Sequence, residues 1–186
     1  MASIATRRLA KELRDIQMNG TPAGIELIEV NGDKWIMGIE VLGESLYVGE
    51  KFAVLFQFEP QYPISSPIVT FMPRYTPPPD STSSFDKSTV YTTPIHPHTY
   101  SNGHICLDLL GPQWSPVLTV TSICLSLQSM LASCRKLERP PDNDRYVKSA
   151  PDNPKKTRFH YDGKQSSNER RASAHLLPFL IIFTHR

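Results

Sequence analysis

Four runs of β-branched and aromatic residues between residues 25 and 72 constrain the fold of this chain more than any other feature. In the third run, Phe52, Val54, Phe56 and Phe58 alternate with other residues, which is typical of a strand with one buried face. The predicted strands are Ile25 with Leu27–Val30, Trp35–Val41, Lys51–Phe58 and Ile68–Met72. Because the links between them are short, with a tight Asn31-Gly32 turn after the first, they predict a four-stranded antiparallel meander.

Two segments with helical periodicity flank the predicted strands. Residues 3–18 predict an amphipathic helix that Ser3 caps and Asn19-Gly20 ends. Its expected apolar stripe is Ile4, Leu9, Leu13 and Ile16. Its expected polar side carries Arg7, Arg8, Lys11 and Arg14 against Glu12 and Asp15.

A second, more apolar helix is predicted from residue 119 or 120 to about Arg135, on the spacing of Ile123, Leu127, Met130, Leu131 and Cys134. A short further helix is expected near Arg145, and residues 150–175 are polar enough to be loose. The sequence therefore predicts an α+β fold: an N-terminal helix, the meander sheet, an active-site loop, a central helix packed on the sheet and a short C-terminal helical region.

Two segments are expected to lie outside the packed core. Residues 73–94 contain five prolines and many Ser and Thr, which predicts a mobile surface loop inserted into a core domain of residues 1–162. Residues 163–186 are expected to be a disordered tail, and they end in an apolar run without an amphipathic pattern. This tail has two interpretations, an intron read through in the gene or a short anchor for a membrane or partner.

Charge and hydropathy exclude several classes of protein. The net charge of the 186 residues is +2, but residues 1–154 carry 13 basic and 16 acidic residues, so the main body is not a nucleic-acid platform. The longest apolar run, Leu176–Phe183, is too short to span a membrane, and the charged N-terminus does not resemble a secretory signal. We therefore expect a cytoplasmic or nuclear protein that binds neither nucleic acid nor membrane.

Three cysteines raise the question of whether one of them is chemically active. An odd number of cysteines without a secretory signal indicates a reducing compartment, and the lack of a CxxC pair argues against a structural zinc site. Cys106 lies in polar, non-periodic sequence close to His96, His98 and His104, as a nucleophile would. The alternative at this point is a buried structural cysteine, which is the expectation for Cys124 and Cys134 on the predicted helix.

Ordered motifs make the chain resemble the ubiquitin-conjugating enzymes over residues 3–162, the insertion excepted. The motifs are Tyr62-Pro63 with Pro67, His96-Pro97, Ser101-Asn102-Gly103, Ile105-Cys106-Leu107-Asp108, Trp114-Ser115-Pro116 and Pro140-Pro141-Asp142-Asn143. The W class of this family is the most similar, since it shares His98, the PPDN run and Asn153-Pro154-Lys155-Lys156.

The resemblance implies a catalytic role for Cys106, which would accept ubiquitin as a thioester and pass it to an amine. His98 stands where most of the family has asparagine, and it would either stabilise an oxyanion or order the loop. Asp142 and Asn143 would position the acceptor amine, with Glu138 as a further candidate; all three have the alternative of being solvated loop residues. Asp108 is expected to hold the turn after the cysteine.

The resemblance also implies partners, and it implies no metal or cofactor, because ATP is used by the upstream activating enzyme. The expected partners are ubiquitin, that activating enzyme, RING or U-box ligases and protein substrates. The docking residues would be Arg8, Lys11, Pro63, Ile64, Ser115 and Pro116; the alternative for the two basic residues is an ordinary solvated helix face.

The W class further implies transfer to protein N-termini in preference to lysine side chains. The α-amino group has the lower pKa, so its neutral fraction near pH 7 is the larger. The competing functions are conjugation of another ubiquitin-like modifier, non-enzymatic ubiquitin binding, and hydrolysis by Cys106 with a histidine.

Overall fold

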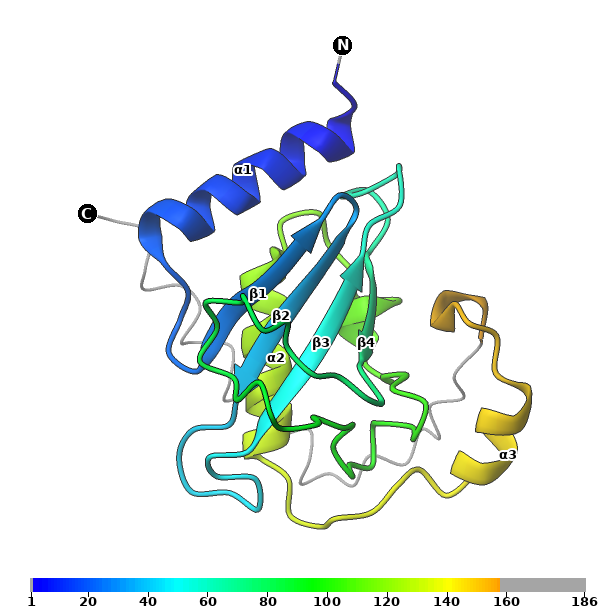
Figure 1. Cartoon of the computed structure of the whole chain (residues 1–186). Coiled ribbons are helices and arrows are strands. Elements are labelled where there is room, and N and C mark those ends of the chain that lie inside the picture. The colour runs from blue at the N-terminus through cyan, green and yellow to red at the C-terminus, as the bar shows by residue number, and fades with distance from the viewer. Residues whose placement is uncertain (1, 158–186) are drawn as a thin grey trace.

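The computed structural model describes residues 2–157 and has an α+β fold, as predicted (Figure 1). Its regular elements, in order, are α1 (Ile4–Asn19), β1 (Ile25–Asn31), β2 (Lys34–Glu40), β3 (Lys51–Gln57), β4 (Ile68–Phe71), the 3-10 turn η1 (Asp108–Leu110), α2 (Val120–Ala132), α3 (Asn143–Ser149) and the 3-10 turn η2 (Pro154–Lys156). The expectation of a core reaching residue 162 and of a tail over residues 163–186 falls on residues outside this description.

The four strands form one antiparallel sheet in the order β1-β2-β3-β4, which confirms the predicted meander. The β1–β2 hairpin is tight, since Asn31 pairs with Lys34. On β2, Trp35, Met37 and Ile39 are buried at alternate positions, as the twofold periodicity of a strand requires.

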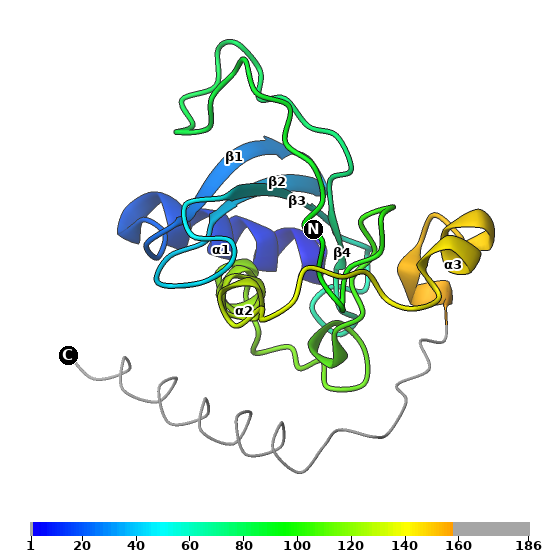
Figure 2. The ribbon, with the colours of Figure 1, turned by 90° about the horizontal axis from the view of Figure 1, so that it is seen from below.

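The main core lies between the sheet and the two long helices. Figure 2 shows α1 and α2 on the same side of the sheet. Ile123, Leu127 and Leu131 recur every fourth residue on α2 and are fully buried. The predicted helix reaches about Arg135, but α2 ends at Ala132 with Ser133 as its C-cap, because the Cys134 amide bonds the Leu131 carbonyl at 3.1 Å instead of continuing the α-helical pattern. Cys134 is therefore beyond the helix, although it is buried as expected.

Residues 73–94 cover the opposite face of the sheet, as Figure 2 shows. They are irregular, as predicted for a loop, and three aromatic residues attach them to the sheet, since Tyr75, Phe85 and Tyr91 are buried against Ala53. The mobility of the segment stays a prediction. The Phe85 ring lies directly over Gly38, where an added Cβ would meet it at 2.5 Å. The proline, serine and threonine content of the segment did not predict the burial of its aromatic residues.

Three of the four residues of the predicted stripe on α1, Leu9, Leu13 and Ile16, pack against the core, and the prediction fails at two other positions. Ile4 is 57% exposed, whereas Glu12, expected on the polar side, is buried. The Glu12 carboxylate accepts hydrogen bonds from the Val120 amide at 2.8 Å, from Arg8 Nε at 2.5 Å and from the Tyr62 hydroxyl. These partners offset the cost of burying the charge, and they join α1 to the start of α2.

The C-terminal part of the described chain is more ordered than the sequence indicates. α3 begins at Asn143, two residues before the expected start, with Asp142 at its N-cap. Beyond it, Pro154 is buried, and Lys155 Nζ bonds Glu59 Oε2 at 2.5 Å and the Ser66 carbonyl at 2.9 Å. Within residues 2–157 no helix has the length and apolar character needed to cross a membrane.

Candidate active site

Backbone hydrogen bonds fold the segment that carries Cys106 back on itself. The Cys106 amide donates to the His98 carbonyl at 2.9 Å, and the Tyr100 amide donates to the His104 carbonyl at 2.9 Å. Gly103 makes the turn with φ of 90°, a conformation that disfavours residues with a Cβ. Its carbonyl accepts from the Phe71 amide at 2.9 Å, and an added Cβ would lie 1.9 Å from the Phe71 carbonyl oxygen. The Asn102-Gly103 turn predicted before the cysteine is therefore fixed to β4.

His96 supports this loop as a neutral side chain. Its Nδ1 accepts a hydrogen bond from the His98 amide at 3.0 Å, so Nδ1 carries no proton. Burial, aided by the charge of His98 and opposed by a hydrogen bond with the Met130 backbone, lowers the pKa of His96 to about 4. The first residue of the His-Pro pair thus has a structural role.

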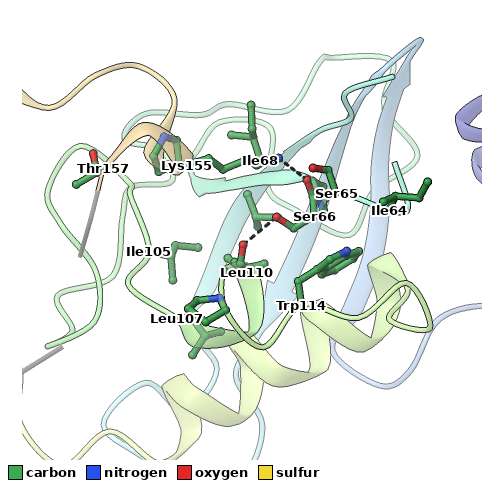
Figure 3. Close-up of a pocket in the computed structure, with 15 residues that line it drawn as sticks. Ile64, Ser65, Ser66, Ile68, Ile105, Leu107, Leu110, Trp114, Lys155 and Thr157 are labelled. Atoms are coloured by element: carbon green, nitrogen blue, oxygen red, sulfur yellow. Dashed lines mark hydrogen bonds between the residues drawn. The ribbon is translucent and has the colours of Figure 1, made fainter. Parts of the chain in front are cut away.

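Cys106 is the most accessible of the three cysteines. None of the three forms a disulfide; Cys124 and Cys134 are buried, and burial raises the pKa of the Cys124 thiol, which opposes nucleophilic use. Ile105 and Leu107 line a groove of about 750 Å³ between β4, η1 and η2 (Figure 3). Cys106, between these two residues, is not among those that line the groove.

Two tyrosines lie near the thiol. Burial, the Asp142 carboxylate and charge on Cys106 raise the pKa of Tyr100. Burial also raises the pKa of Tyr146, and charge on Cys106 adds to that effect against a hydrogen bond with Thr157. Both phenols therefore stay protonated at neutral pH and lie within electrostatic range of Cys106.

Asp142 and Asn143 lie at the start of α3 and contact the cysteine-bearing loop. The Tyr100 hydroxyl donates to Asp142 Oδ1 at 3.1 Å, and the Ser101 amide donates to Asn143 Oδ1 at 2.9 Å. Glu138 is elsewhere: its exposed carboxylate pairs with Lys136 Nζ at 2.5 Å. This placement favours Asp142 and Asn143 over Glu138 as acceptor-positioning residues.

His98 and Asp108 contribute to the loop through their backbones. The exposed His98 ring lies 5.4 Å from the His96 ring between centroids, while its amide and carbonyl make the two bonds described above. Its use as an oxyanion donor stays a prediction. The Asp108 carbonyl accepts from the amides of Gly111 and Gln113, both at 2.9 Å, in keeping with its expected role in the turn.

Of the residues predicted to dock partners, Arg8, Pro63, Ile64 and Pro116 lie around Trp114, which lines the groove together with Ile64. Trp114 Nε1 donates to the Pro63 carbonyl at 2.9 Å, and Ile64 is 72% exposed. Arg8 donates to the carbonyls of Pro116 and Leu118, both at 2.8 Å. Arg8 therefore braces this loop in the free protein.

The other docking candidates differ in exposure. Lys11 Nζ is exposed and pairs with Asp15 at 2.9 Å. Pro116 is exposed, whereas Ser115 is half-buried and its carbonyl accepts from the Leu118 amide at 3.0 Å.

Sequence reasoning missed the contributions of Glu12, Tyr100, His104 and Tyr146. Tyr100 and His104 fall between the motifs that carry the resemblance, and His104 was considered only as one of three histidines near Cys106. Tyr146 carried no signal beyond its place in a short predicted helix. Among residues 2–157, no group of three His, Cys, Asp or Glu side chains is placed to hold a metal ion.

Comparison with known proteins identifies similar chains. Residues 8–161 match the family described as ubiquitin-conjugating enzyme. A probable ubiquitin-conjugating enzyme E2 W-A of Danio rerio is 44% identical over 87% of this chain and 97% of its own. A ubiquitin-conjugating enzyme E2 W of Caenorhabditis elegans is 40% identical over 87% of this chain and 99% of its own. A crystal structure of a ubiquitin-conjugating enzyme E2 from Agrocybe aegerita is 53% identical, covers 83% of this chain and 100% of its own, and superposes with a TM-score of 0.70.

Proposed function

We propose, because this chain belongs to the ubiquitin-conjugating enzyme family, that Cys106 carries ubiquitin as a thioester and passes it to N-terminal α-amino groups of protein substrates. The observation that carries the proposal is the juxtaposition at Cys106: an accessible thiol in a loop clamped by backbone bonds, with Asp142 and Asn143 bonded to the same loop.

Two acyl transfers at one sulfur account for the reaction. The Cys106 thiolate attacks the thioester held by the activating enzyme, whose cysteine leaves as a thiolate. A neutral amine then attacks the new thioester, transfers a proton to solvent water as the amide forms, and releases the Cys106 thiolate. The imidazole of His98 is the proposed donor to the oxyanion in both steps. No cofactor takes part here, because ATP is consumed upstream.

The state of the Asp142 carboxylate supports a preference for α-amino groups. Asp142 Oδ1 accepts a hydrogen bond from the Tyr100 hydroxyl, and Oδ2 lies 3.6 Å from Arg145 Nη2. Each oxygen keeps a further lone pair that can accept a hydrogen bond from a neutral amine, the form that is more abundant for an α-amino group than for lysine. With pKa values near 7.7–8.0 and about 10.4, an α-amino group has roughly several hundred times the neutral fraction of lysine at pH 7.

The surface at Pro63, Ile64, Ser115 and Pro116 is the proposed docking site for a RING or U-box ligase. Ile64 is a large exposed apolar side chain, and such residues anchor interfaces. Lys11, one turn from Arg8 on α1, would meet the activating enzyme. The odd number of cysteines in the sequence supports a reducing compartment, the cytoplasm or the nucleus.

The test has two stages on the full chain. Incubation with ATP, activating enzyme and ubiquitin should give an adduct that thiol reductant removes; Cys106→Ala should give none, and Cys134→Ala should charge. The charged protein is then offered two peptides, one with a free N-terminus and no lysine, one N-acetylated with a single lysine.

We expect faster discharge onto the free N-terminus at pH 7. Between pH 7 and pH 9, after subtraction of hydrolysis, the lysine rate should rise about 100-fold and the α-amino rate about 10-fold. Charging of Cys106→Ala would overturn the thioester assignment, and faster discharge onto acetylated lysine peptide at pH 7 would overturn the acceptor preference.

A further inference from the structure

α3 is a short helix that lies against the loop of Cys106. It has seven residues and no buried side chain, yet its first residues contact the loop of Cys106. A helix this short gains little stability from its own hydrogen bonds, so packing must hold it in place. Tyr146, one turn into α3, provides such packing.

The ring of Tyr146 lies against the ring of Tyr100. The two centroids are 4.0 Å apart and the planes are inclined by 34°. Tyr100 is buried and belongs to the cysteine-bearing loop, so this aromatic contact joins α3 to the loop directly.

The phenol oxygen of Tyr146 makes a second connection. It lies 2.8 Å from His104 Nδ1 and 3.3 Å from Thr157 Oγ1. Burial lowers the pKa of His104, against an opposing contact with Asp152, so the imidazole is neutral at physiological pH. His104 stands two residues before Cys106, which places both connections of Tyr146 on the same loop.

The consequence reaches Asp142 through the backbone of α3. The Tyr146 amide donates to the Asp142 carbonyl at 2.9 Å, while the Tyr100 hydroxyl donates to Asp142 Oδ1. The same two aromatic residues therefore fix the main chain and the side chain of Asp142.

We propose that Tyr146 is a positioning residue for the transfer step, which holds Asp142 and Asn143 beside Cys106 while an amine attacks. This inference rests on the proposed thioester chemistry. Displacement of catalytic groups by about 1 Å can cost on the order of 100-fold in rate, so a loose α3 slows aminolysis strongly. Hydrolysis of the thioester by water needs no amine-positioning residue and therefore depends less on Tyr146.

The experiment measures discharge from purified thioester, so that differences in charging are divided out. For Tyr146→Ala we expect the ratio of aminolysis to hydrolysis to fall at least tenfold. Tyr146→Phe keeps the ring contact and loses the phenol oxygen, so its ratio should fall about threefold. Lys148→Ala, on the exposed side of the same helix, is the matched control and should keep the ratio of the unmodified chain.

A double-mutant cycle separates positioning from general damage. In the background Asp142→Ala with Asn143→Ala, adding Tyr146→Ala should slow aminolysis less than twofold further, because there is nothing left to position. An unchanged ratio in Tyr146→Ala, a parallel fall of both rates, or full additivity in the cycle would each overturn the inference. Failure of the unmodified chain to charge at Cys106 would instead overturn the proposed function.

Discussion

Residues 73–94 and residues 96–106 both lie against the sheet without regular secondary structure, yet different groups hold them. In the first segment aromatic side chains make the main attachments, with Phe85 over Gly38 and the Tyr75 hydroxyl donating to Glu29 at 2.5 Å. In the second, backbone amides and carbonyls pair with each other and with β4 at Gly103.

The two kinds of attachment differ in how far the backbone of the segment must move when one residue is substituted. A side-chain anchor can be shortened while the backbone keeps its course, whereas a backbone clamp at van der Waals contact leaves no space for adjustment. We therefore expect the segment that carries Cys106 to tolerate substitution poorly, and the covering segment to lose stability without loss of chemistry.

The largest effect is expected for Gly103→Ala. The new Cβ would lie 1.9 Å from the Phe71 carbonyl oxygen, in a residue with φ of 90°. The free energy of unfolding should fall by about 4 kcal/mol or more, and charging should be lost. Gly43→Ala, with φ of 81° and open space around it, carries the backbone strain without the clash and should cost about 1 kcal/mol. If urea unfolding gives the two variants equal stabilities, the backbone at Gly103 can move away from the Phe71 carbonyl.

An intermediate effect is expected for Phe85→Ala. Removing a buried aromatic ring costs about 3 kcal/mol, because its contacts with Tyr91 and with the sheet above Gly38 are lost. Thermal unfolding measures this loss, and Val90→Ala, exposed in the same segment, should change stability by less than about 0.5 kcal/mol. Charging and discharge of Phe85→Ala, measured well below its melting temperature, should match the unmodified chain. A slowed discharge in the folded variant would mean that both segments serve the chemistry.

The smallest expected effect is on the pH dependence of stability, which should differ between the two segments. The pKa of His96 is about 4 in the folded protein and about 6.5 when unfolded, so the unfolded state binds the extra proton between these values. Stability should therefore fall as pH drops from 6.5 toward 4, by about 2 kcal/mol at pH 5 relative to pH 7.5. His96→Gln should lose less over this range, although His104 shifts in the same direction and keeps part of the slope.

The covering segment should respond in a different pH range. Hydrogen bonds from the backbone and side chain of Ser88, and from Thr89, lower the pKa of Asp86, so its contribution is present above about pH 4 and is lost below. Urea titrations of the unmodified chain and His96→Gln at pH 7.5, 5 and 3.5 check both ranges. If the unmodified chain and His96→Gln lose the same stability between pH 7.5 and pH 5, protonation of His96 does not cause the loss.

The sequence allowed prediction of features that depend on local pattern or on a dense motif. The meander and α2 follow from periodicity, and the loop of Cys106 follows from a block of consecutive motif residues. The start of α3 and the burial of Glu12 did not follow, because each depends on a partner distant in sequence. The end of α2 did not follow because the apolar spacing continues to Cys134 after the α-helical hydrogen bonds stop. Glu12 is the clearest example: its helical position is polar by pattern, and only the Val120 amide, 108 residues away, makes it an interior residue.

That carboxylate also bears on how the molecule comes apart. Glu12 belongs to the first helix, Tyr62 to the turn before β4, and Val120 to the first turn of α2, and all three meet at one buried charge. Undocking of α1 would take the carboxylate from both the Tyr62 hydroxyl and the Val120 amide, and undocking of α2 would remove one of the three hydrogen bonds that offset the burial of the charge. The N-terminal helix and the central helix therefore belong to one cooperative unit. Neither helix can separate from the fold alone without a large cost in free energy.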